Sequence, residues 1–439
     1  MNTGPARGMR DFLPEDVRRR QYVIGVIADV YQRYGFEPLE TPAVENLETL
    51  QGKYGEEGDR LIFKILKRGE GAETGQADLA LRYDLTVPLA RVVAEYRARL
   101  PKFFKRYQVQ PVWRADRPQK GRFREFYQCD VDAIGSRSMV VEAELLAAAA
   151  DVFLELGFAD FRIVVNHRGL LNAILSQAGV AGDDRGAALV IMDKLDKIGA
   201  NGVREEMRAK GFRDEVAGTL LSQLGAEAPA DWLERPGDGL NEEGRAAMQE
   251  LRGIFSLSKG TSAGPHLDLD RALARGLSYY TGSIFEVRVP DLAGSLGGGG
   301  RYDNLIGMFS GDSVPACGIS LGLERILVVM GERNMFPPAL LATPADVMVA
   351  VWNEGQIADL LSLAATLRSA GLRVEMYPEA DKIGKQFKYA SARNIPFVAV
   401  IGDEELANGT VAVKNMKTGE QAAHARAAVA AHIKSVISG

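Results

Sequence analysis

The spacing of hydrophobic and polar positions changes several times along the chain, and each change predicts a new structural element. In residues 14–34 the apolar side chains recur every three or four positions, which predicts a long first helix that ends at Gly35. In residues 105–132 the apolar and polar side chains alternate on two arms, and residues 115–122 between them have turn residues and no apolar run. This stretch predicts two antiparallel strands joined by a long loop.

Alternation places every second side chain of this hairpin on the same face. Arg114 ends the first arm, Gln128 and Asp132 lie on the second, and the pattern predicts that the three face the same way. Residues 101–128 hold eight Lys or Arg and two acidic residues, a local charge of +6 in a chain of net charge −5. Such a hairpin is either a solvated surface or an anion-binding site. Trp113 beside Arg114, with carboxylates on the opposite arm, favours the binding site.

Polar residues interrupt apolar patterns at two further places. The alternation of residues 79–88 runs into Asp84 and Thr86 directly before a predicted helix. These two side chains either cap that helix or bind a ligand. Arg275 lies between Ala274 and Gly276 in an otherwise apolar strand pattern. A buried arginine needs an anionic partner, which is either an internal carboxylate or a bound phosphate.

Two later segments also suggest a ligand. Residues 297–303 read Gly-Gly-Gly-Gly-Arg-Tyr-Asp, and a run of glycines lets backbone amides approach a bound group. Residues 314–330 predict a strand that passes into a helix, with Arg325 near the helix start. Because a cation at a helix N-terminus opposes the helix dipole, Arg325 indicates an anionic ligand at that end.

Changes of pattern also divide the chain, whose 439 residues predict two or three domains. Residues 170–260 are rich in Lys, Glu, Asp and Ala at helical spacing and predict a helical insertion in the main fold. Residues 334–345 predict a linker. From residue 346 onward, strands alternate with helices, which predicts a small parallel or mixed sheet with helices on its faces and a last helix at residues 423–436.

Composition excludes several classes of protein. The chain is 46% hydrophobic and 25% charged, without a run approaching the ~18 apolar residues of a membrane span. Its first residues have no apolar signal core, so we expect a cytoplasmic protein. The two cysteines, Cys129 and Cys317, and the four histidines have no metal-ligand spacing, so no protein-bound zinc is expected.

Taken together, the motifs resemble those of class II aminoacyl-tRNA synthetases, and specifically the histidyl-tRNA synthetase family. The resemblance covers nearly the whole chain. Residues 104–132 look like motif 2 of the class, residues 314–330 like motif 3 and residues 35–42 like motif 1. Arg-Gly-Leu-Ser-Tyr-Tyr at 275–280 and Gly-Gly-Gly-Arg-Tyr-Asp at 298–303 look like the two signatures peculiar to the histidine enzymes.

The resemblance implies an α/β fold with an α+β catalytic core, in which helices flank an antiparallel sheet. This core would comprise residues 1–169 (motifs 1 and 2) and 261–333 (the histidine signatures and motif 3), on either side of the helical insertion at 170–260. The linker at 334–345 would lead to an α/β anticodon-binding domain at 346–439. Residues 36–42, extended and bounded by prolines, suit either a subunit contact or core packing, and the resemblance implies a homodimer.

The implied reaction is the ATP-dependent ligation of L-histidine to its tRNA through a histidyl-adenylate, with release of AMP and pyrophosphate. ATP would enter with bound Mg²⁺. Reactions at phosphorus depend on positioning and positive charge more than on covalent catalysis. Arginine suits this task because it is always charged and its donors form a fork.

Residue roles follow from the same resemblance. The catalytic arginines would be Arg114, Arg275 and Arg325. ATP would be bound by Arg114, Arg122 and Arg325. Histidine would be bound by Asp84, Thr86, Gln128, Asp132, Arg275, Tyr279 and Tyr280. The acceptor end of the tRNA would meet Gln119, Lys120 and Arg124. The chain departs from the family pattern in having Asp84 and Asp132 where Glu is common, and Ser278 where Asp is common.

Two other functions fit parts of the pattern. One is a catalytically silent, histidine-sensing regulatory subunit of ATP phosphoribosyltransferase; such relatives usually lack the C-terminal domain and the catalytic arginines, which this chain has. The other is a different class II synthetase, such as the prolyl or threonyl enzyme. The absence of a zinc ligand set argues against the threonyl enzyme, and residues 275–280 favour histidine.

Overall fold

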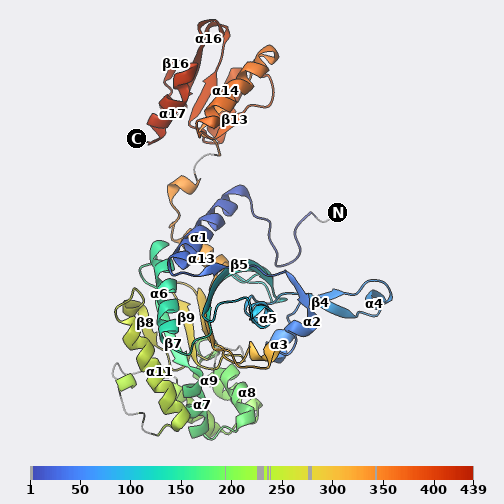
Figure 1. Cartoon of the computed structure of the whole chain (residues 1–439), viewed down its shortest axis with the longest axis vertical. Coiled ribbons are helices and arrows are strands. Elements are labelled where there is room, and N and C mark those ends of the chain that lie inside the picture. The colour runs from blue at the N-terminus through green and yellow to red at the C-terminus, as the bar shows by residue number, and fades with distance from the viewer. Residues whose placement is uncertain are drawn as a thin grey trace. The chain divides into compact units, whose positions relative to one another are not determined.

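The computed structural model describes residues 3–192, 194–224, 232–234, 237, 239–274, 279–341 and 344–438. The chain divides into two compact units, Met1–Phe336 and Pro337–Gly439 (Figure 1). The division falls inside the predicted linker, whereas the finer domain boundaries stay predictions. Each unit has its own hydrophobic core and is described by itself.

A mixed, mostly antiparallel sheet forms the centre of the first unit, as predicted. Within the described residues it has eight strands in the order β1-β5-β6-β11-β10-β9-β7-β8, and only the pairs β1·β5 and β7·β8 are parallel. The strands are β1 (Glu37–Pro38), β5 (Phe104–Trp113), β6 (Glu125–Ile134), β7 (Arg162–His167), β8 (Leu267–Leu269), β9 (Ser283–Arg288), β10 (Gly297–Arg301) and β11 (Ala316–Gly322).

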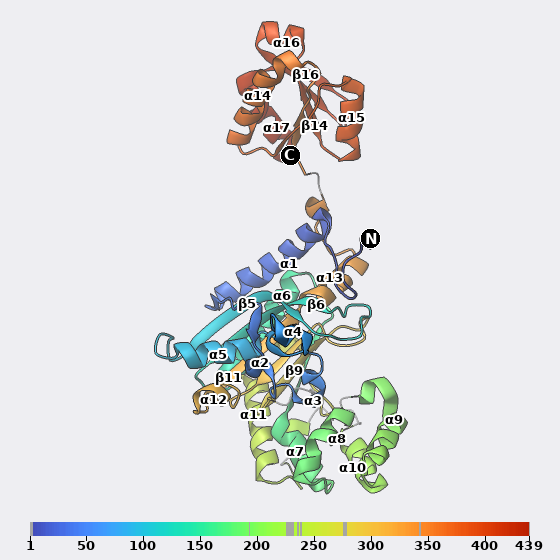
Figure 2. The same cartoon turned by 90° about the vertical axis from the view of Figure 1, so that its right-hand side faces the viewer.

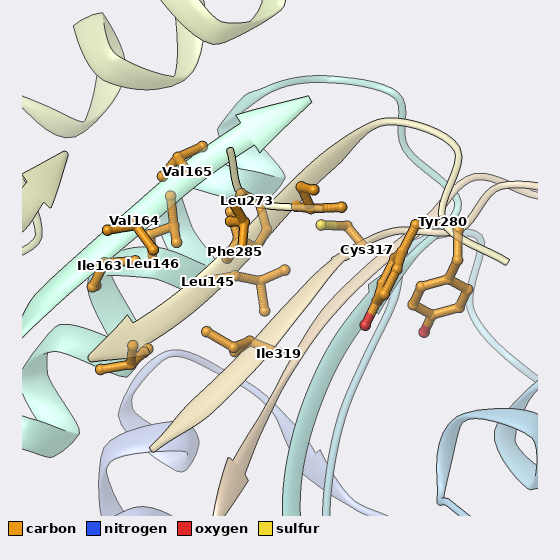
Figure 3. Close-up of a cluster of buried hydrophobic side chains, with 14 of the residues drawn as sticks. Leu145, Leu146, Ile163, Val164, Val165, Leu273, Tyr280, Phe285, Cys317 and Ile319 are labelled. Carbon is orange, nitrogen blue, oxygen red and sulfur yellow. The ribbon is translucent and has the colours of Figure 1, made fainter. Parts of the chain in front are cut away.

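Helices cover the apolar face of this sheet. Helices α1 (Pro14–Arg33), α6 (Val140–Glu155) and α13 (Leu323–Glu332) contact one another or the strands β5, β6 and β11. Odd-numbered side chains of the central strands enter this core: the Tyr107 ring lies 6.1 Å from that of Tyr31, and Val131 and Ile319 are buried. Figure 3 shows Leu145 of α6 close to Phe285 and Ile319. The even-numbered side chains of the same strands are therefore left for the opposite face.

A second, three-stranded sheet adjoins the first in the order β2-β4-β3, with β2 at Val44–Asn46, β3 at Lys64–Leu66 and β4 at Ala77–Leu81. The helices around it are α2 (Leu47–Leu50), α3 (Gly55–Asp59), α4 (Glu70–Glu73), α5 (Thr86–Tyr96) and, against α5, α12 (Gly307–Ser310). Figure 1 shows the turn that holds α4 projecting from the body of the first unit.

The segment predicted as an insertion is helical. It contains α7 (Arg168–Gln177), α8 (Arg185–Met192), α9 (Leu195–Ala209), α10 (Asp214–Leu224) and α11 (Glu242–Ser258). Helices α7 and α11 pack on each other and on β7, so both belong to the main core. Helices α8 to α10 lie farther from the sheet (Figure 2).

The second unit has the predicted alternation of strands and helices. Its sheet has the order β13-β12-β14-β15-β16, with parallel pairing around β12 and antiparallel pairing beyond β14. The elements are β12 (Val347–Val349), α14 (Ile357–Ser369), β13 (Val374–Met376), α15 (Ile383–Ala392), β14 (Phe397–Val400), α16 (Asp403–Asn408), β15 (Thr410–Asn415), β16 (Gln421–Ala425) and α17 (Val429–Ser438). Short 3₁₀ helices lie at Gly182–Asp184, Trp232–Glu234, Gly264–His266, Pro338–Leu341, Glu354–Gln356 and Arg426–Ala428.

The start predicted for the last helix, residue 423, is wrong. Residues 421–425 form β16, which pairs with β15, and α17 begins only at Val429. The Asn415 side chain accepts hydrogen bonds from the backbone of Lys417 and Thr418, and Gly419 has φ +78°, so the chain turns back sharply. Although alanine favours helix, this turn brings the segment to the open edge of β15, where ladder hydrogen bonds outweigh the propensity.

Within the described residues, no helix has an apolar stretch of the length that crossing a bilayer requires.

Candidate functional site

A cavity of about 300 Å³ lies on the polar face of the eight-stranded sheet. Strand register explains its composition. Asp132 of β6 is paired with Gly318 of β11, and Asp130 is paired with Ser320, so these side chains form rows across the sheet. A Cβ atom on Gly318 would lie 1.9 Å from Asp132 Oδ1, so the glycine leaves the room that the carboxylate occupies.

Most of the predicted ligand-binding residues meet in this cavity. Of the ten assigned to histidine or ATP, nine line it: Asp84, Thr86, Arg114, Arg122, Gln128, Asp132, Tyr279, Tyr280 and Arg325. The tenth, Arg275, lies outside the described residues, as does Ser278. The fold thus brings residues from Asp84 to Arg325, which are far apart in the sequence, into one site. Their individual roles stay predictions.

The inner part of the cavity is acidic. Asp84, Asp130 and Asp132 are each at most 3% exposed, and Gln128 is 8% exposed. Four of their oxygens, Asp84 Oδ2, Gln128 Oε1, Asp130 Oδ1 and Asp132 Oδ2, have no hydrogen-bond partner among the described residues, although Asp132 Oδ2 lies 2.8 Å from the charged Arg106. Because an unsatisfied buried acceptor is costly, this part of the cavity is suited to a ligand that brings donors and positive charge.

Burial also controls the ionisation of these carboxyls. It raises the pKa of Asp84 and of Asp132, and it raises the pKa of Asp130 to about 7. The charge of Arg106 acts in the opposite direction on the pKa of each, as does a hydrogen bond from the Tyr302 hydroxyl to Asp132 Oδ1 for Asp132. A cationic ligand group would favour the ionised forms in the same way.

Asp84 caps the following helix, which is one of the two roles that its sequence position suggested, and its role in ligand binding stays a prediction. Its Oδ1 accepts hydrogen bonds from the Val87 backbone N–H at the start of α5 and from the Tyr54 hydroxyl, both at 3.0 Å. Its Oδ2 remains for the cavity, which Asp84 lines. Helix capping therefore holds the carboxylate in place and leaves one oxygen for a ligand.

The outer part of the cavity is basic. The Arg114 guanidinium lies over the Tyr83 ring at 4.3 Å and the Phe126 ring at 5.1 Å, and its Nε donates to the Tyr83 carbonyl at 3.0 Å. These contacts fix the direction of the guanidinium, whose planar face suits stacking on aromatic rings.

Arg325 is held at the start of α13. One of its terminal nitrogens donates to the Ser295 carbonyl at 2.6 Å. Gly294 has φ +100°, and a Cβ atom there would lie 3.1 Å from the same nitrogen, so this glycine both forms the turn and leaves room for the arginine. Arg122 lies in the β5–β6 loop, where its Nε and one of its terminal nitrogens donate to the two Asp116 oxygens, each at 2.9 Å.

The three residues predicted to meet the tRNA acceptor end are not presented together. Gln119 and Lys120 border a shallow hollow between the loop and α13, where Lys120 pairs with Glu332 at 2.5 Å. Arg124 instead donates to the Asp116 carbonyl, and its backbone N–H donates to Gly8. Arg124 is thus bound into the base of the loop, and its predicted contact with tRNA would require another arrangement.

Sequence reasoning missed several residues that line the cavity. Asp130 lines the cavity and follows the same period-two alternation as Gln128 and Asp132, so its place in the site could have been predicted from the sequence. Tyr302, whose hydroxyl donates to Asp132, is the second residue after the glycine run. Glu324 accepts from Arg20 at 2.8 Å and from the Tyr127 backbone at 3.0 Å, contacts between distant segments for which the pattern gave no signal.

The glycine run of β10 serves close strand packing as well as the ligand cavity. Gly297, Gly298 and Gly299 line the cavity. A Cβ atom on Gly299 would lie 2.0 Å from the Gly318 carbonyl oxygen of β11, and one on Gly300 would lie 2.4 Å from the Ser283 carbonyl oxygen of β9. Side chains at these positions would therefore push the neighbouring strands apart.

Known protein families match both units of the chain. A family model described as Histidyl-tRNA synthetase matches residues 8–326, and one described as Anticodon binding domain matches residues 346–436. The chain belongs to the histidyl-tRNA synthetase family. It is 45% identical to the histidine--tRNA ligase of Porphyromonas gingivalis, covering 94% of this chain and 95% of that protein, and 42% identical to that of Flavobacterium johnsoniae, with 94% and 95% covered.

The fold is also that of solved members of the histidyl-tRNA synthetase family. The crystal structure of histidyl-tRNA synthetase from Nostoc sp. PCC 7120 matches with a TM-score of 0.80 and 31% identity, covering 99% of each chain. A structure from Bacillus halodurans, described as an ATP phosphoribosyltransferase regulatory subunit/histidyl-tRNA synthetase, matches with a TM-score of 0.72 at 23% identity, which supports a shared fold only.

Proposed function

We propose that this chain attaches L-histidine to its tRNA through a histidyl-adenylate formed from ATP, as expected of a class II aminoacyl-tRNA synthetase. The observation that carries the proposal is the division of one cavity into an acidic inner part and an arginine-lined outer part. Histidine brings a cationic amine and ring donors, and ATP brings phosphates. The two substrates therefore complement the two parts of the cavity and would meet where these adjoin.

The first step joins the two substrates. A carboxylate oxygen of histidine attacks the α-phosphorus of ATP, which forms the mixed anhydride as the bond to the β-phosphate oxygen breaks and pyrophosphate leaves. In our proposal Arg114 holds the α-phosphate, and Arg325 with Arg122 holds the outer phosphates. Their fixed positive charge stabilises the negative charge that spreads over the phosphoryl oxygens. Arg275 would act beside the α-phosphate, and ATP would enter as its magnesium complex.

In the second step, a hydroxyl of the 3′-terminal adenosine of tRNA attacks the histidyl carbonyl, and AMP leaves. Gln119 and Lys120, which directly precede the cavity-lining residues Gly121 and Arg122 in the β5–β6 loop, would meet the acceptor end, with Arg124 at the base of the same loop. The second unit, which matches the anticodon-binding model, would bind the other end of the tRNA. We also propose that the protein acts as a homodimer in the cytoplasm.

Recognition of histidine would use the acidic inner part. Asp84, Gln128 and Asp132 would bind the amine, with Thr86 beside Asp84, and Tyr279 and Tyr280 would lie near the imidazole. The two tyrosine rings have centroids 4.9 Å apart, and Tyr279 lies 6.1 Å from Tyr302. A site with buried polar partners rejects an amino acid that lacks the matching donors by large factors.

The regulatory-subunit alternative is not favoured. The arginines Arg114 and Arg325 are in place around the cavity, and residues 346–436 match the anticodon-binding model. A histidine sensor needs neither the phosphate-facing arginines nor a tRNA-binding unit. The relatives that cover most of this chain at 42–45% identity are described as histidine--tRNA ligases.

Amino-acid-dependent exchange of labelled pyrophosphate into ATP tests the proposal, with each of the twenty amino acids supplied in turn. We expect exchange with histidine alone, and we expect Arg114→Ala to lower it by roughly 10²-fold or more because a phosphate-facing charge is lost. Arg117→Ala is the matched control, since Arg117 is an exposed arginine of the same loop that does not line the cavity. Histidine binding without any exchange would contradict the proposal and support the regulatory reading.

A further inference from the structure

A buried arginine lies directly beside the acidic part of the cavity. Arg106 of β5 is fully buried and is the cross-strand partner of Asp132 in β6. Its terminal NH2 nitrogen lies 2.8 Å from Asp132 Oδ2 and 3.9 Å from Asp130 Oδ2. Arg106 does not itself line the cavity, so any effect on a ligand passes through the two carboxylates.

Further polar contacts fix the position of this guanidinium. Its other terminal nitrogen donates to Gln108 Oε1 at 3.1 Å. The amide of Gln108 donates in turn to the Thr41 hydroxyl at 2.9 Å and to Gln110 Oε1 at 2.6 Å. Because Gln108 and Thr41 are also buried, the guanidinium is surrounded by protein and stays beside the two carboxylates.

The carboxylates would be unstable in ionised form without this partner. Asp84, Asp130 and Asp132 are buried around one cavity, and three negative charges in such a site repel one another. Tyr302 donates a hydrogen bond to Asp132, but a neutral hydroxyl does not balance a charge. Removing one partner of a buried ion pair leaves the other charge uncompensated, which in this site favours protonation of the acid.

We propose that Arg106 is a positioning residue for histidine, holding Asp132 ionised and directed toward the cavity, and that Asp130 acts as a third carboxylate for the substrate amine. This inference rests on the proposed function, since it concerns how that site binds its amino acid. The shorter aspartate at position 132 lies within the sheet, where the Arg106 side chain of the neighbouring strand reaches it. The pair Arg106 and Asp130 thus completes a pocket built from aspartates.

Several other groups act on the same carboxyls and must be common to every variant compared. They lie on α1, between α2 and α5, directly after β5, on β6, after β10 and on β11, and they are Tyr31, Tyr54, Arg82, Tyr83, Arg114, Cys129, Tyr302, Cys317 and Ser320. None of these groups changes when Arg106 is substituted. A difference in pH dependence between wild type and an Arg106 variant therefore reports the effect of the arginine itself.

The test measures the KM values for histidine and for ATP in pyrophosphate exchange from pH 6 to pH 8.5, on the full chain. In Arg106→Gln we expect the KM for histidine to rise roughly tenfold or more at pH 7, the effect of moving a carboxyl pKa by one unit, and to approach the wild-type value as the pH rises. The KM for ATP should change less than about twofold. Arg106→Lys keeps a positive charge but lacks the forked donors of a guanidinium. Its KM for histidine should lie between those of wild type and Arg106→Gln.

Two results would overturn the proposal. One is the pattern that a merely structural role predicts. In that case the KM for histidine of Arg106→Gln rises equally at every pH, or its KM for ATP rises in parallel. The other is a wild-type pH profile in Arg106→Gln.

If Arg106→Gln fails to fold, Asp130→Asn tests the same idea, because it should flatten the dependence of the histidine KM on pH between 6 and 8. A dependence as steep as that of wild type would contradict the role of Asp130. If the wild type exchanges nothing, the proposed function fails first, and histidine binding measured by calorimetry on the same variants then decides the inference separately.

Discussion

At the scale of single residues, Arg301 shows that an arginine in a family signature can serve the fold. Its Nε and NH2 donate to the two Glu142 oxygens at 2.6 and 2.7 Å, and the pair joins β10 to α6 while nearly excluded from water. Asp303 lies 3.3 Å away on the outer side. The charge that the sequence places after the glycine run thus faces the core, whereas Arg114 and Arg325 face the cavity.

We predict that Glu142→Gln destabilises the first unit by about 3 kcal/mol, because it leaves a buried guanidinium with only a part-exposed partner. The measurement is the urea midpoint of the first unit followed by tryptophan fluorescence. Glu155→Gln is the control: Glu155 is also on α6 and paired with an arginine, Arg33, but both side chains are exposed, so its midpoint should be unchanged. Equal midpoint shifts in the two variants would refute the distinction.

Asp130 leads to a second residue-scale prediction, on stability rather than affinity. Its pKa is raised by burial to about 7, above the value near 3.9 of an unfolded aspartate, so its contribution to the stability of the folded state is lost as the pH rises between these values. Asp130→Asn cannot ionise and escapes this loss. We therefore compare the unfolding free energy of the variant with that of wild type in the absence of histidine. The difference, variant minus wild type, should be about 2 kcal/mol larger at pH 7.5 than at pH 5.

Thermal or urea unfolding at the two pH values measures this gain, and saturating histidine should reverse the order by stabilising the wild type more than the variant. An identical difference at both pH values would mean that Asp130 does not titrate in this range. Higher stability of the unliganded variant would show that the binding site is kept at a cost in folding free energy.

At the scale of elements, the N-terminal segment and the β5–β6 loop support each other. The Arg10 guanidinium lies 3.3 Å from the centre of the Phe123 ring, which lines the cavity, and the Gly8 carbonyl accepts from the Arg124 backbone. Gly8 has φ +84°, and a Cβ atom there would meet Arg124 and Pro118 within 2.9 Å. The segment before α1 thus holds the base of the loop whose Arg122 faces ATP in our proposal.

We therefore predict that Gly8→Ala raises the KM for ATP in pyrophosphate exchange by roughly threefold to tenfold, because the added methyl group displaces the loop from its place beside the phosphates. The KM for histidine should change much less. Gly35→Ala provides the matched control, since Gly35 also has positive φ (+75°) but open space around its Cβ position. It should lower the melting temperature without changing either KM. If Gly8→Ala leaves the KM for ATP unchanged, the N-terminal segment does not support ATP binding.

At the scale of the whole molecule, the chain consists of two units with separate hydrophobic cores. The cavity residues all lie before residue 326, and the anticodon-binding match begins at residue 346. From residue 345 onward the chain has ten Lys or Arg and ten Asp or Glu, so its proposed contact with RNA would depend on local basic residues such as those of α15 rather than on net charge.

We predict that a chain ending at residue 336 keeps histidine-dependent pyrophosphate exchange within about threefold, because the cavity is complete without the second unit. Charging of tRNA should fall by roughly 10²-fold or more, since one of two linked contacts is lost. Circular dichroism and the exchange rate establish first that the shortened chain is folded. Loss of exchange in a folded, shortened chain would show that the second unit contributes to the first reaction step.

Elements with strong periodicity, and the chemical groups that they carry, could be predicted from the amino-acid sequence. The β5–β6 hairpin, the position of Arg325 in the first turn of α13 and the alternating fold of the second unit were all predicted, because side-chain period and helix-end signals are local properties. The same alternation predicted that Arg114, Gln128 and Asp132 share a face, and all three line one cavity.

Which charged side chains pair with one another depends on the folded chain. Arg106 and Asp132 face each other through strand register, Arg301 and Glu142 through the packing of α6, and Glu324 and Arg20 through the crossing of α1 and α13. Local pattern does not determine such pairs, because they join positions 26 to 304 residues apart. For the same reason residues 423–425 form a strand although their alanines favour a helix. They pair with the free edge of β15, and the local sequence does not show that this edge is available.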